Sequence, residues 1–179
     1  MTYDVCNGSH GQMLAALRQY FDLLGFETVL GDNSKGEPDI IASLPSASWK
    51  YVLAIEAKTK EKGEEEPVGS VTQVMGDAGV IQRKTNSQVL PVLVTQKDIF
   101  SPKAVEVAKQ KVRMLSASVL VAVMDQTLKS IEAWGNLTAS GKPQFVDSIL
   151  SHYEVKRLFM PADNAVATLE DVKQIVVNK

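Results

Sequence analysis

The sequence predicts an α/β protein: a mixed β-sheet flanked by helices, with the core order helix, strand, strand, strand, helix, strand. Segments whose apolar residues recur at helical spacing alternate with short apolar runs that are rich in β-branched residues. Three strand-like runs follow one another with short connections, which favours antiparallel pairing. Two later runs of the buried type are separated by a helical segment, which implies at least one right-handed crossover.

The first half of the chain is expected to contain one helix and three strands. Residues 11–25 form the helix, because Met13, Leu17 and Phe21 share a face and Gly25 stands where a C-cap glycine ends a helix. Pro38 cannot donate to a β-ladder and therefore suits the start of a strand. The three expected strands cover residues 26–30, 39–44 and 49–58.

The second half alternates helices with buried strands. A helix is expected over residues 70–84, followed by a strand within residues 86–95. Ser101 and Pro102 supply an N-cap and a proline at the first helical position, and the helix that they open is expected to run to about residue 115. The later expectations are a buried strand over 118–124, a loop over 134–142, a helix over 146–158 and a terminal helix opened by a capping box at Thr168 and Asp171.

Length and composition indicate an ordinary globular domain. We expect 179 residues to form a core domain over residues 1–125, with residues 126–179 as a C-terminal extension packed on it or belonging to the same domain. A single cysteine, Cys6, excludes a disulfide framework and a cysteine-based zinc site. The N-terminus lacks a basic region followed by an apolar run, and no stretch approaches about 18 apolar residues, so we expect a cytoplasmic protein without a membrane segment.

Three charged residues stand at the ends of two neighbouring strands. Asp39 begins one strand, and Glu56 and Lys58 lie near the end of the next, on the same face because strand side chains alternate. If the two strands pair as a hairpin, Asp39 approaches Glu56 across the ladder. Two carboxylates so close repel each other unless a cation lies between them, and hard oxygen ligands suit Mg²⁺. A neighbouring lysine can hold the attacking water, so the pattern predicts metal-assisted hydrolysis of a phosphodiester.

Pro38-Asp39, followed by Glu56-Ala57-Lys58, resembles the PD-(D/E)XK motif of the restriction-endonuclease-like nucleases. The expected element order also matches the core of that family, and the resemblance covers roughly residues 8–124. It implies a restriction-endonuclease-like fold and a Mg²⁺-dependent endonuclease that acts on DNA and leaves a 5′-phosphate. Mn²⁺ is expected to substitute for Mg²⁺.

The resemblance also implies a role for each residue of the motif. Asp39 and Glu56 would bind the metal, Ala57 would contribute its backbone carbonyl, and Lys58 would position the attacking water. Many members carry a glutamine on the next helix that contacts the active site or the DNA backbone, and Gln73 falls at that place. An ordinary glutamine on a helix surface is an equal alternative for Gln73.

The first helix departs from the pattern of many relatives, which carry a glutamate there that completes the metal site. The corresponding stretch of this chain holds His10 and Gln12 and no acid. Either side chain could ligate the metal or bind a metal-bound water, more weakly than a carboxylate, while a surface or capping role is the simpler alternative for His10. The number of metal ions therefore stays open.

Basic residues concentrate in one part of a chain whose net charge is only −2. Residues 83–113 contain seven basic and two acidic residues, a net charge of +5, which leaves −7 for the remainder. Lys109 and Arg113 are expected on one helix face at i,i+4 spacing, where they could contact a DNA backbone. An ordinary solvated helix is the alternative.

The leading functional expectation is the cleavage subunit or domain of a restriction system, with DNA as partner. Because the net charge of −2 predicts weak DNA affinity, we expect a homodimer or a separate DNA-recognition subunit or domain. The alternatives are a Holliday-junction resolvase-like or repair nuclease, and a catalytically weak nuclease fold that serves as a DNA-binding or assembly module. A third alternative is an unrelated α/β protein in which the Glu56-Ala57-Lys58 pattern is coincidental. In that case Asp39 and Glu56 would not lie near each other.

Overall fold

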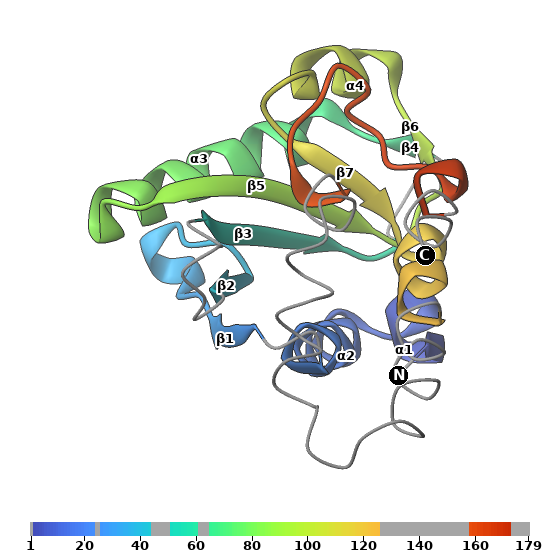
Figure 1. Cartoon of the computed structure of the whole chain (residues 1–179), viewed down its shortest axis with the longest axis horizontal. Coiled ribbons are helices and arrows are strands. Elements are labelled where there is room, and N and C mark those ends of the chain that lie inside the picture. The colour runs from blue at the N-terminus through green and yellow to red at the C-terminus, as the bar shows by residue number, and fades with distance from the viewer. Residues whose placement is uncertain (1, 24–25, 44–50, 61–64, 126–157, 173–179) are drawn as a thin grey trace, which may run out of the picture.

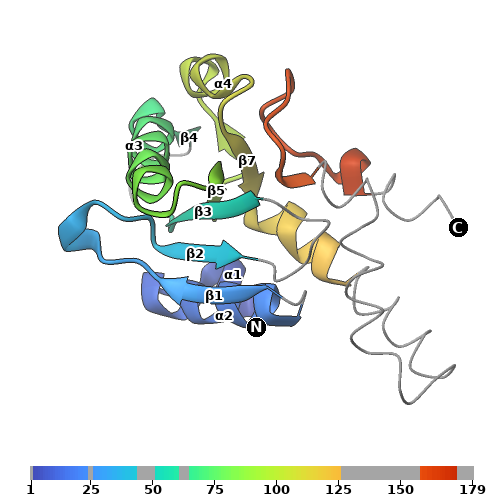
Figure 2. The same cartoon turned by 60° about the vertical axis from the view of Figure 1, so that its left-hand side comes forward.

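The computed structural model describes residues 2–23, 26–43, 51–60, 65–125 and 158–172. A five-stranded mixed sheet consists, in spatial order, of β1 (Glu27–Leu30), β2 (Ile40–Ser43), β3 (Tyr51–Lys58), β5 (Gln88–Thr95) and β7 (Arg113–Ser116). Helices lie on both sides of this sheet, α1 (Thr2–Asn7) and α2 (His10–Leu23) on one side, α3 (Val68–Thr85) and α4 (Pro102–Ala108) on the other (Figures 1 and 2). The predicted α/β class and its mixed, helix-flanked sheet are therefore confirmed.

The pairing of the strands follows the connections between them. Strands β1, β2 and β3 pair antiparallel, as their short connections predicted. Strand β5 pairs parallel to β3 after the crossover through α3, and β7 pairs parallel to β5. A short 3-10 helix, η1 (Asn33–Lys35), lies in the β1–β2 connection, and a separate two-stranded parallel sheet contains β4 (Glu65–Glu66) and β6 (Ile99–Phe100).

Each face of the sheet has its own hydrophobic core. The larger core, on the side of α2, includes Phe21 and Ile55, and the rings of Phe21 and Phe26 meet edge to face with centroids 5.5 Å apart. The smaller core, on the side of α3, contains Val74 and Leu93. Because Ile55 faces the larger core, the residue after it on β3 faces α3, which decides where the charged end of this strand points.

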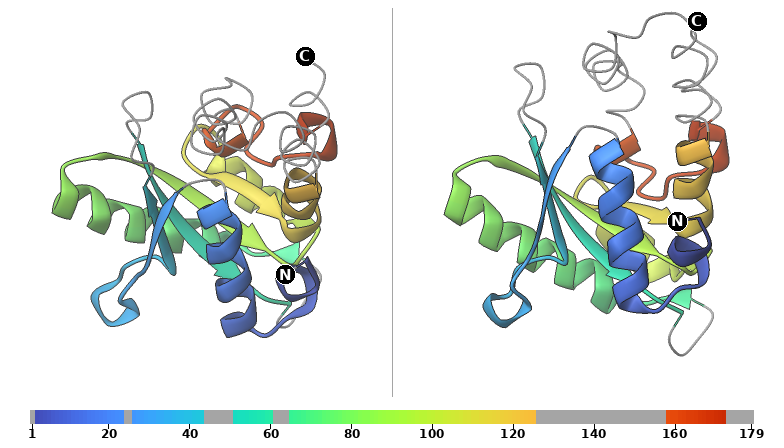
Figure 3. Two further views of the ribbon diagram at one scale, coloured as in Figure 1. Left: turned by 60° about the horizontal axis from the view of Figure 1, so that its bottom comes forward. Right: turned by 90° about the horizontal axis from the view of Figure 1, so that it is seen from below.

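The buried strand expected over residues 118–124 is wrong, because residues 117–125 form a helix. The last strand of the sheet is β7, immediately before it, so the chain leaves the sheet where the strand was expected to begin. Positions 119, 120, 123 and 124 are buried while positions 118 and 125 are exposed, a helical pattern that packs on the same side of the sheet as α1 and α2 (Figure 3). Three valines and one leucine favoured a strand, and tertiary packing overrides that propensity.

The helix expected to run to about residue 115 ends at Ala108. The chain then turns through Lys109 and Gln110, whose φ of 57° is left-handed, and Arg113 begins β7. The prediction that Lys109 and Arg113 share one helix face is therefore wrong. Arg113 is only 4% exposed and its guanidinium donates to the backbone carbonyl of Leu158, so it is not available to a DNA backbone.

The described part of the C-terminal segment packs on this core. Phe159 belongs to the larger core, and Val166 forms a β-bridge with Met114. The capping box is confirmed, because Thr168 Oγ1 accepts from the Asp171 backbone N–H at 3.3 Å while the Asp171 carboxylate accepts from the Thr168 backbone N–H at 2.7 Å. The loop expected over 134–142, and the helix expected over 146–158 except for its last residue, lie outside the described residues. Within the described ranges, no helix combines the length and the apolar character that crossing a membrane requires.

Candidate active site

The register of β2 and β3 brings two carboxylates together at one end of the antiparallel pair. Ile40 lies opposite Ile55, so Asp39, the residue before Ile40, lies beside Glu56, the residue after Ile55. Asp39 Oδ2 accepts a hydrogen bond from the backbone N–H of Ala57 at 2.9 Å, which fixes this carboxylate across the ladder. Both carboxylates are buried, with 5% of Asp39 and 2% of Glu56 exposed. The approach expected from the hairpin is thus present.

Gly31 supports the position of Asp39 from the other end of the β1–β2 connection. Its backbone N–H donates to the carbonyl oxygen of Asp39 at 3.1 Å. A Cβ atom at this position would lie 1.8 Å from the carbonyl oxygen of Pro38, so only glycine permits so close an approach of the two backbones. The proline before the first carboxylate and the glycine opposite it therefore set the geometry of the site together.

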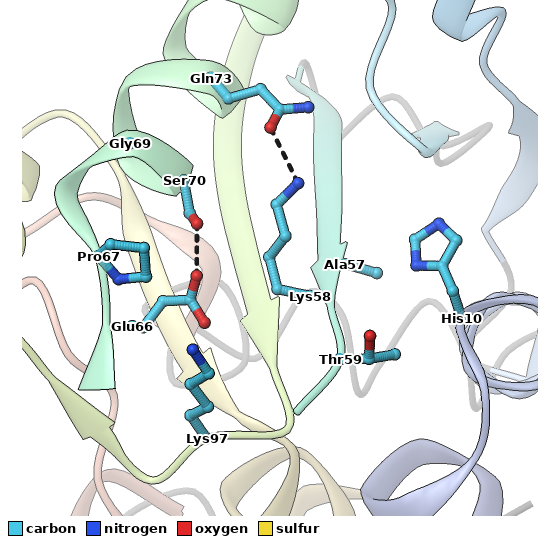
Figure 4. Close-up of a pocket in the computed structure, with 10 residues that line it drawn as sticks. All are labelled: His10, Ala57, Lys58, Thr59, Glu66, Pro67, Gly69, Ser70, Gln73 and Lys97. Atoms are coloured by element: carbon cyan, nitrogen blue, oxygen red, sulfur yellow. Dashed lines mark hydrogen bonds between the residues drawn. The ribbon is translucent and has the colours of Figure 1, made fainter. Parts of the chain in front are cut away.

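Lys58 and Gln73 complete a hydrogen-bonded triangle with Glu56. The Lys58 ammonium donates to Glu56 Oε1 at 2.7 Å and to Gln73 Oε1 at 2.9 Å, the second of which is drawn in Figure 4. Gln73 Nε2 donates to the same Glu56 Oε1 at 2.6 Å. Glu56 and Lys58 lie on the face of β3 that α3 covers, and α3 places Gln73 above them. The structure therefore joins Gln73 to the motif residues by two hydrogen bonds, and the residue itself is exposed on α3.

The second oxygen of Glu56 lies in an unfavourable place for a charged group. Burial raises the pKa of the Glu56 carboxyl, and the neighbouring Asp39 and Asp77 act in the same direction, while Lys58 opposes them. Glu56 Oε2 is buried and has no hydrogen-bond partner among the described residues. A buried carboxylate oxygen without a donor costs stability, and a cation is the ligand that would compensate it.

The two accessory residues, both in the first turn of α2, have different surroundings. His10 Nε2 lies 3.4 Å from Asp39 Oδ1, and this imidazole, 45% exposed on its side chain, stands beside the carboxylate pair. Gln12 Oε1 instead accepts from the backbone N–H of Ser9 at 2.9 Å, a contact that caps the start of α2. The structure therefore brings His10 to the site and gives Gln12 a structural role.

One residue near the site had no place among the sequence expectations. Asp77 lies on α3 one turn after Gln73, close enough to interact electrostatically with Lys58 and Asp39. Burial raises the pKa of the Asp77 carboxyl. The available signal was its spacing, because residues four apart on a helix are neighbours on one face.

A pocket of about 960 Å³ opens beside this cluster. His10, Lys58 and Gln73 line one part of it, and the opposite part is formed around Glu66 and the first turn of α3 (Figure 4). Glu66 is buried, but unlike Glu56 it has a hydroxyl donor on each oxygen, from Ser70 and from Thr95. The only carboxylate oxygen among the described residues that is both buried and unpartnered is therefore Glu56 Oε2, next to Lys58 and Gln73.

The donors at this site fit Mg²⁺ better than a transition metal held by a full protein cage. Within the described ranges no three His, Cys, Asp or Glu side chains are arranged as a metal-binding group. Mg²⁺ is commonly held by one or two carboxylates with water in its other positions. Asp39 and Glu56 supply such a pair, and a cation bound there would compensate the buried, unpartnered Oε2 atom of Glu56.

Comparisons with known proteins do not assign the chain to a family. A scan against protein-family models, a search of curated proteins and a search of solved structures found no match. The class that fold and site define is an α/β protein with a buried carboxylate pair and an adjacent lysine at the edge of a pocket.

Proposed function

We propose that the chain is a Mg²⁺-dependent endodeoxyribonuclease of the restriction-endonuclease-like class. The observation that carries the proposal is the convergence of Asp39 and Glu56 on neighbouring strands, with Glu56 Oε2 buried and unpartnered among the described residues. The helix, three antiparallel strands, crossover helix and parallel strand that surround the pair agree with the core order of that class. Mn²⁺ is expected to replace Mg²⁺, since both are held by oxygen ligands.

The residues of the site divide the chemistry among them. Asp39 and Glu56 would hold the metal with the backbone carbonyl of Ala57, a residue that lines the pocket. The chemistry that Mg²⁺ supplies when bound is to lower the pKa of water and to stabilise negative charge on a phosphate. The Lys58 ammonium has three N–H donors and donates two of them, to Glu56 and Gln73. The third would orient the attacking water beside the scissile phosphate.

The charge of the chain suggests how it meets DNA. A net charge of −2 supports only weak binding to a polyanion, and Arg113, expected on a basic helix face with Lys109, is buried at the start of β7. DNA affinity would then come from a second copy of the chain or from a separate recognition subunit or domain. The cleavage subunit or domain of a restriction system is the context that this division of labour fits.

The test is DNA cleavage by the wild-type chain and Lys58→Ala in the presence of Mg²⁺ or Mn²⁺. Plasmid, branched and single-stranded DNA are offered separately, because preferential cleavage of branched DNA would indicate the resolvase-like alternative. Lys103→Ala is the matched control, since Lys103 is an exposed lysine of α4 outside the pocket. We expect cleavage by the wild type and the control and none by Lys58→Ala.

A DNA-binding or assembly module is the second candidate, and one observation favours it. Helix α2 presents His10 to Asp39 where an acid would add a third carboxylate, and an imidazole is a weaker ligand for Mg²⁺ than a carboxylate. DNA binding without cleavage by any of these proteins would support the module. The complete set of Asp39, Glu56 and Lys58 weighs toward the enzyme.

A further inference from the structure

Gln96, the residue after β5, connects two segments of the chain that line the pocket. We propose that Gln96 is a positioning residue, which holds the turn between α1 and α2 against the end of β3 and thereby keeps the His10 imidazole beside Asp39; this inference rests on the proposed nuclease function. Only 5% of Gln96 is exposed, so its side-chain amide is enclosed by the segments that it connects.

Three hydrogen bonds of Gln96 make this connection. Its backbone N–H donates to the Lys58 carbonyl at 2.9 Å, and its Oε1 accepts from the backbone N–H of Lys60 at 3.1 Å. Its Nε2 donates to the Gly8 carbonyl at 2.9 Å, a buried bond between residues 88 positions apart in the sequence. The side-chain amide is therefore the acceptor for the end of β3 and the donor to the α1–α2 turn, a combination that neither an ionised carboxylate nor an apolar side chain offers.

The turn between α1 and α2 transmits this anchor to His10. The Gly8 backbone N–H donates to the Asp4 carbonyl at 3.0 Å, and a Cβ atom at Gly8 would lie 2.5 Å from the same oxygen, so the turn packs closely on α1. Two residues later α2 begins at His10, and a hydrogen bond from the Ser9 N–H to the Gln12 side chain caps that start. A shift of Gly8 would therefore move the first residue of α2.

The position of His10 matters because of the oxygen that it faces. Asp39 Oδ2 accepts from the Ala57 N–H at 2.9 Å, which leaves Oδ1 for a cation. His10 Nε2 lies 3.4 Å from this Oδ1, and Figure 4 shows the ring on the Ala57 side of the pocket. An imidazole nitrogen at this place can bind a metal ion or one of its waters. Residues that orient such a group typically change metal affinity or activity by about 10–100-fold.

The first test uses the metal-free full chain and follows the His10 imidazole by NMR at one fixed pH. The chain has two histidines, so the signal lost in His10→Ala belongs to His10. Asp39→Asn should shift that signal in the wild type, because it removes the charge beside the ring. On a Gln96→Met background the same substitution should shift it less than about half as far. Gln96→Glu, which keeps an acceptor for Lys60 and loses the donor to Gly8, should give the same result.

Arg113→Met is the control for lost stability, because Arg113 is also buried and donates to a carbonyl of the C-terminal segment, at Leu158. On this background Asp39→Asn should shift the His10 signal as far as in the wild type. A full shift on the Gln96→Met or Gln96→Glu background would overturn the inference, since His10 would then remain beside Asp39 without the amide.

The second test measures the Mg²⁺ concentration that gives half-maximal plasmid nicking. We expect Gln96→Met to raise it about tenfold, because a displaced imidazole no longer supports the metal. Added to His10→Ala, Gln96→Met should have no further effect, since it acts through His10. An unchanged Mg²⁺ requirement in Gln96→Met, or a further rise in the double variant, would refute the positioning role. Absence of nicking by the wild type would instead overturn the proposed function, and the NMR comparison then decides on Gln96.

Discussion

At the scale of single residues, Glu56 carries its charge where that charge lowers stability. Burial and two neighbouring carboxylates raise the pKa of its carboxyl, and one of its oxygens has no donor among the described residues. Glu66, also buried, has a hydroxyl on each oxygen. A protein that needed only a folded core would not leave one buried glutamate in this condition, and function is the usual reason for such a cost.

Glu56→Gln is therefore expected to raise the free energy of unfolding, by about 1 kcal/mol at neutral pH without divalent metal. The sign follows from the raised pKa: below the pKa of the unfolded chain the carboxyl is neutral in both states and costs nothing. As pH rises through the raised native pKa, the wild type loses stability and the advantage of Glu56→Gln grows. Urea unfolding at about pH 4 and pH 7.5 measures this difference.

Glu66→Gln is the control, because its carboxylate accepts from two hydroxyls and gains nothing from neutralisation. A Glu56→Gln protein that is less stable than the wild type at pH 7.5 would contradict the assigned cost of the Glu56 charge. The same variant should not cleave DNA, since it removes one of the two carboxylates proposed to hold the metal.

At the scale of elements, the β1–β2 connection sets the position of the first carboxylate. Gly31→Ala would place a methyl group 1.8 Å from the carbonyl oxygen of Pro38, and the backbone must shift to accept it. We expect a loss of about 1–3 kcal/mol in the free energy of unfolding, together with reduced cleavage because Asp39 moves with that backbone. Chemical denaturation and plasmid cleavage, measured on the same protein, test both effects.

Gly11→Ala is the matched change, since a Cβ at Gly11 in α2 meets no atom within 4 Å. It should raise the free energy of unfolding, by up to about 1 kcal/mol, because alanine is the better helix former. Equal effects of the two substitutions would show that the close approach at Gly31 is not what constrains the chain there.

The elements that the sequence predicts well are those whose pattern admits one interpretation. Alternation and a charged strand end place Glu56 and Lys58 on one face, and short connections predict the antiparallel pairing that brings Asp39 beside them. Residues 118–124 fail this criterion, because a short apolar run fits a strand or a buried helix and only the packing above the larger core decides. Asp77 is predicted by neither, since its proximity to Lys58 and Asp39 depends on how α3 lies over β3.

At the scale of the whole molecule, Arg113 joins distant parts of the chain. Its buried guanidinium donates to the carbonyls of Leu158 and Asn164 and reaches Asp171, so it fastens the C-terminal segment to β7. Arg113→Met should lower the free energy of unfolding by about 3 kcal/mol, because the buried carbonyls lose a charged donor. Thermal or urea unfolding measures the loss, with Lys109→Ala, an exposed residue paired only with Glu106 among the described residues, as the near-neutral control.

A net charge of −2 favours only weak binding to DNA, so the proposed nuclease would depend on a further source of DNA affinity. The carboxylate pair contributes to this acidity, and a bound divalent cation would neutralise it. The proposed function therefore depends on metal-dependent chemistry at Asp39 and Glu56 more than on DNA affinity.

The most direct measurement is the Mg²⁺ dependence of plasmid nicking by the wild type, Asp39→Asn and Asp163→Asn. Asp39→Asn keeps the size of the side chain and removes its charge from the site. Asp163→Asn is the control, because Asp163 is an exposed aspartate that accepts a hydrogen bond from Gln110 and is distant from Asp39 in sequence. For the proposed nuclease we expect nicking by the wild type and by Asp163→Asn that requires Mg²⁺ and stops on its removal by EDTA. We expect no nicking by Asp39→Asn at any Mg²⁺ concentration. Equal nicking by Asp39→Asn and the wild type, or nicking that persists in EDTA, would contradict the proposed function.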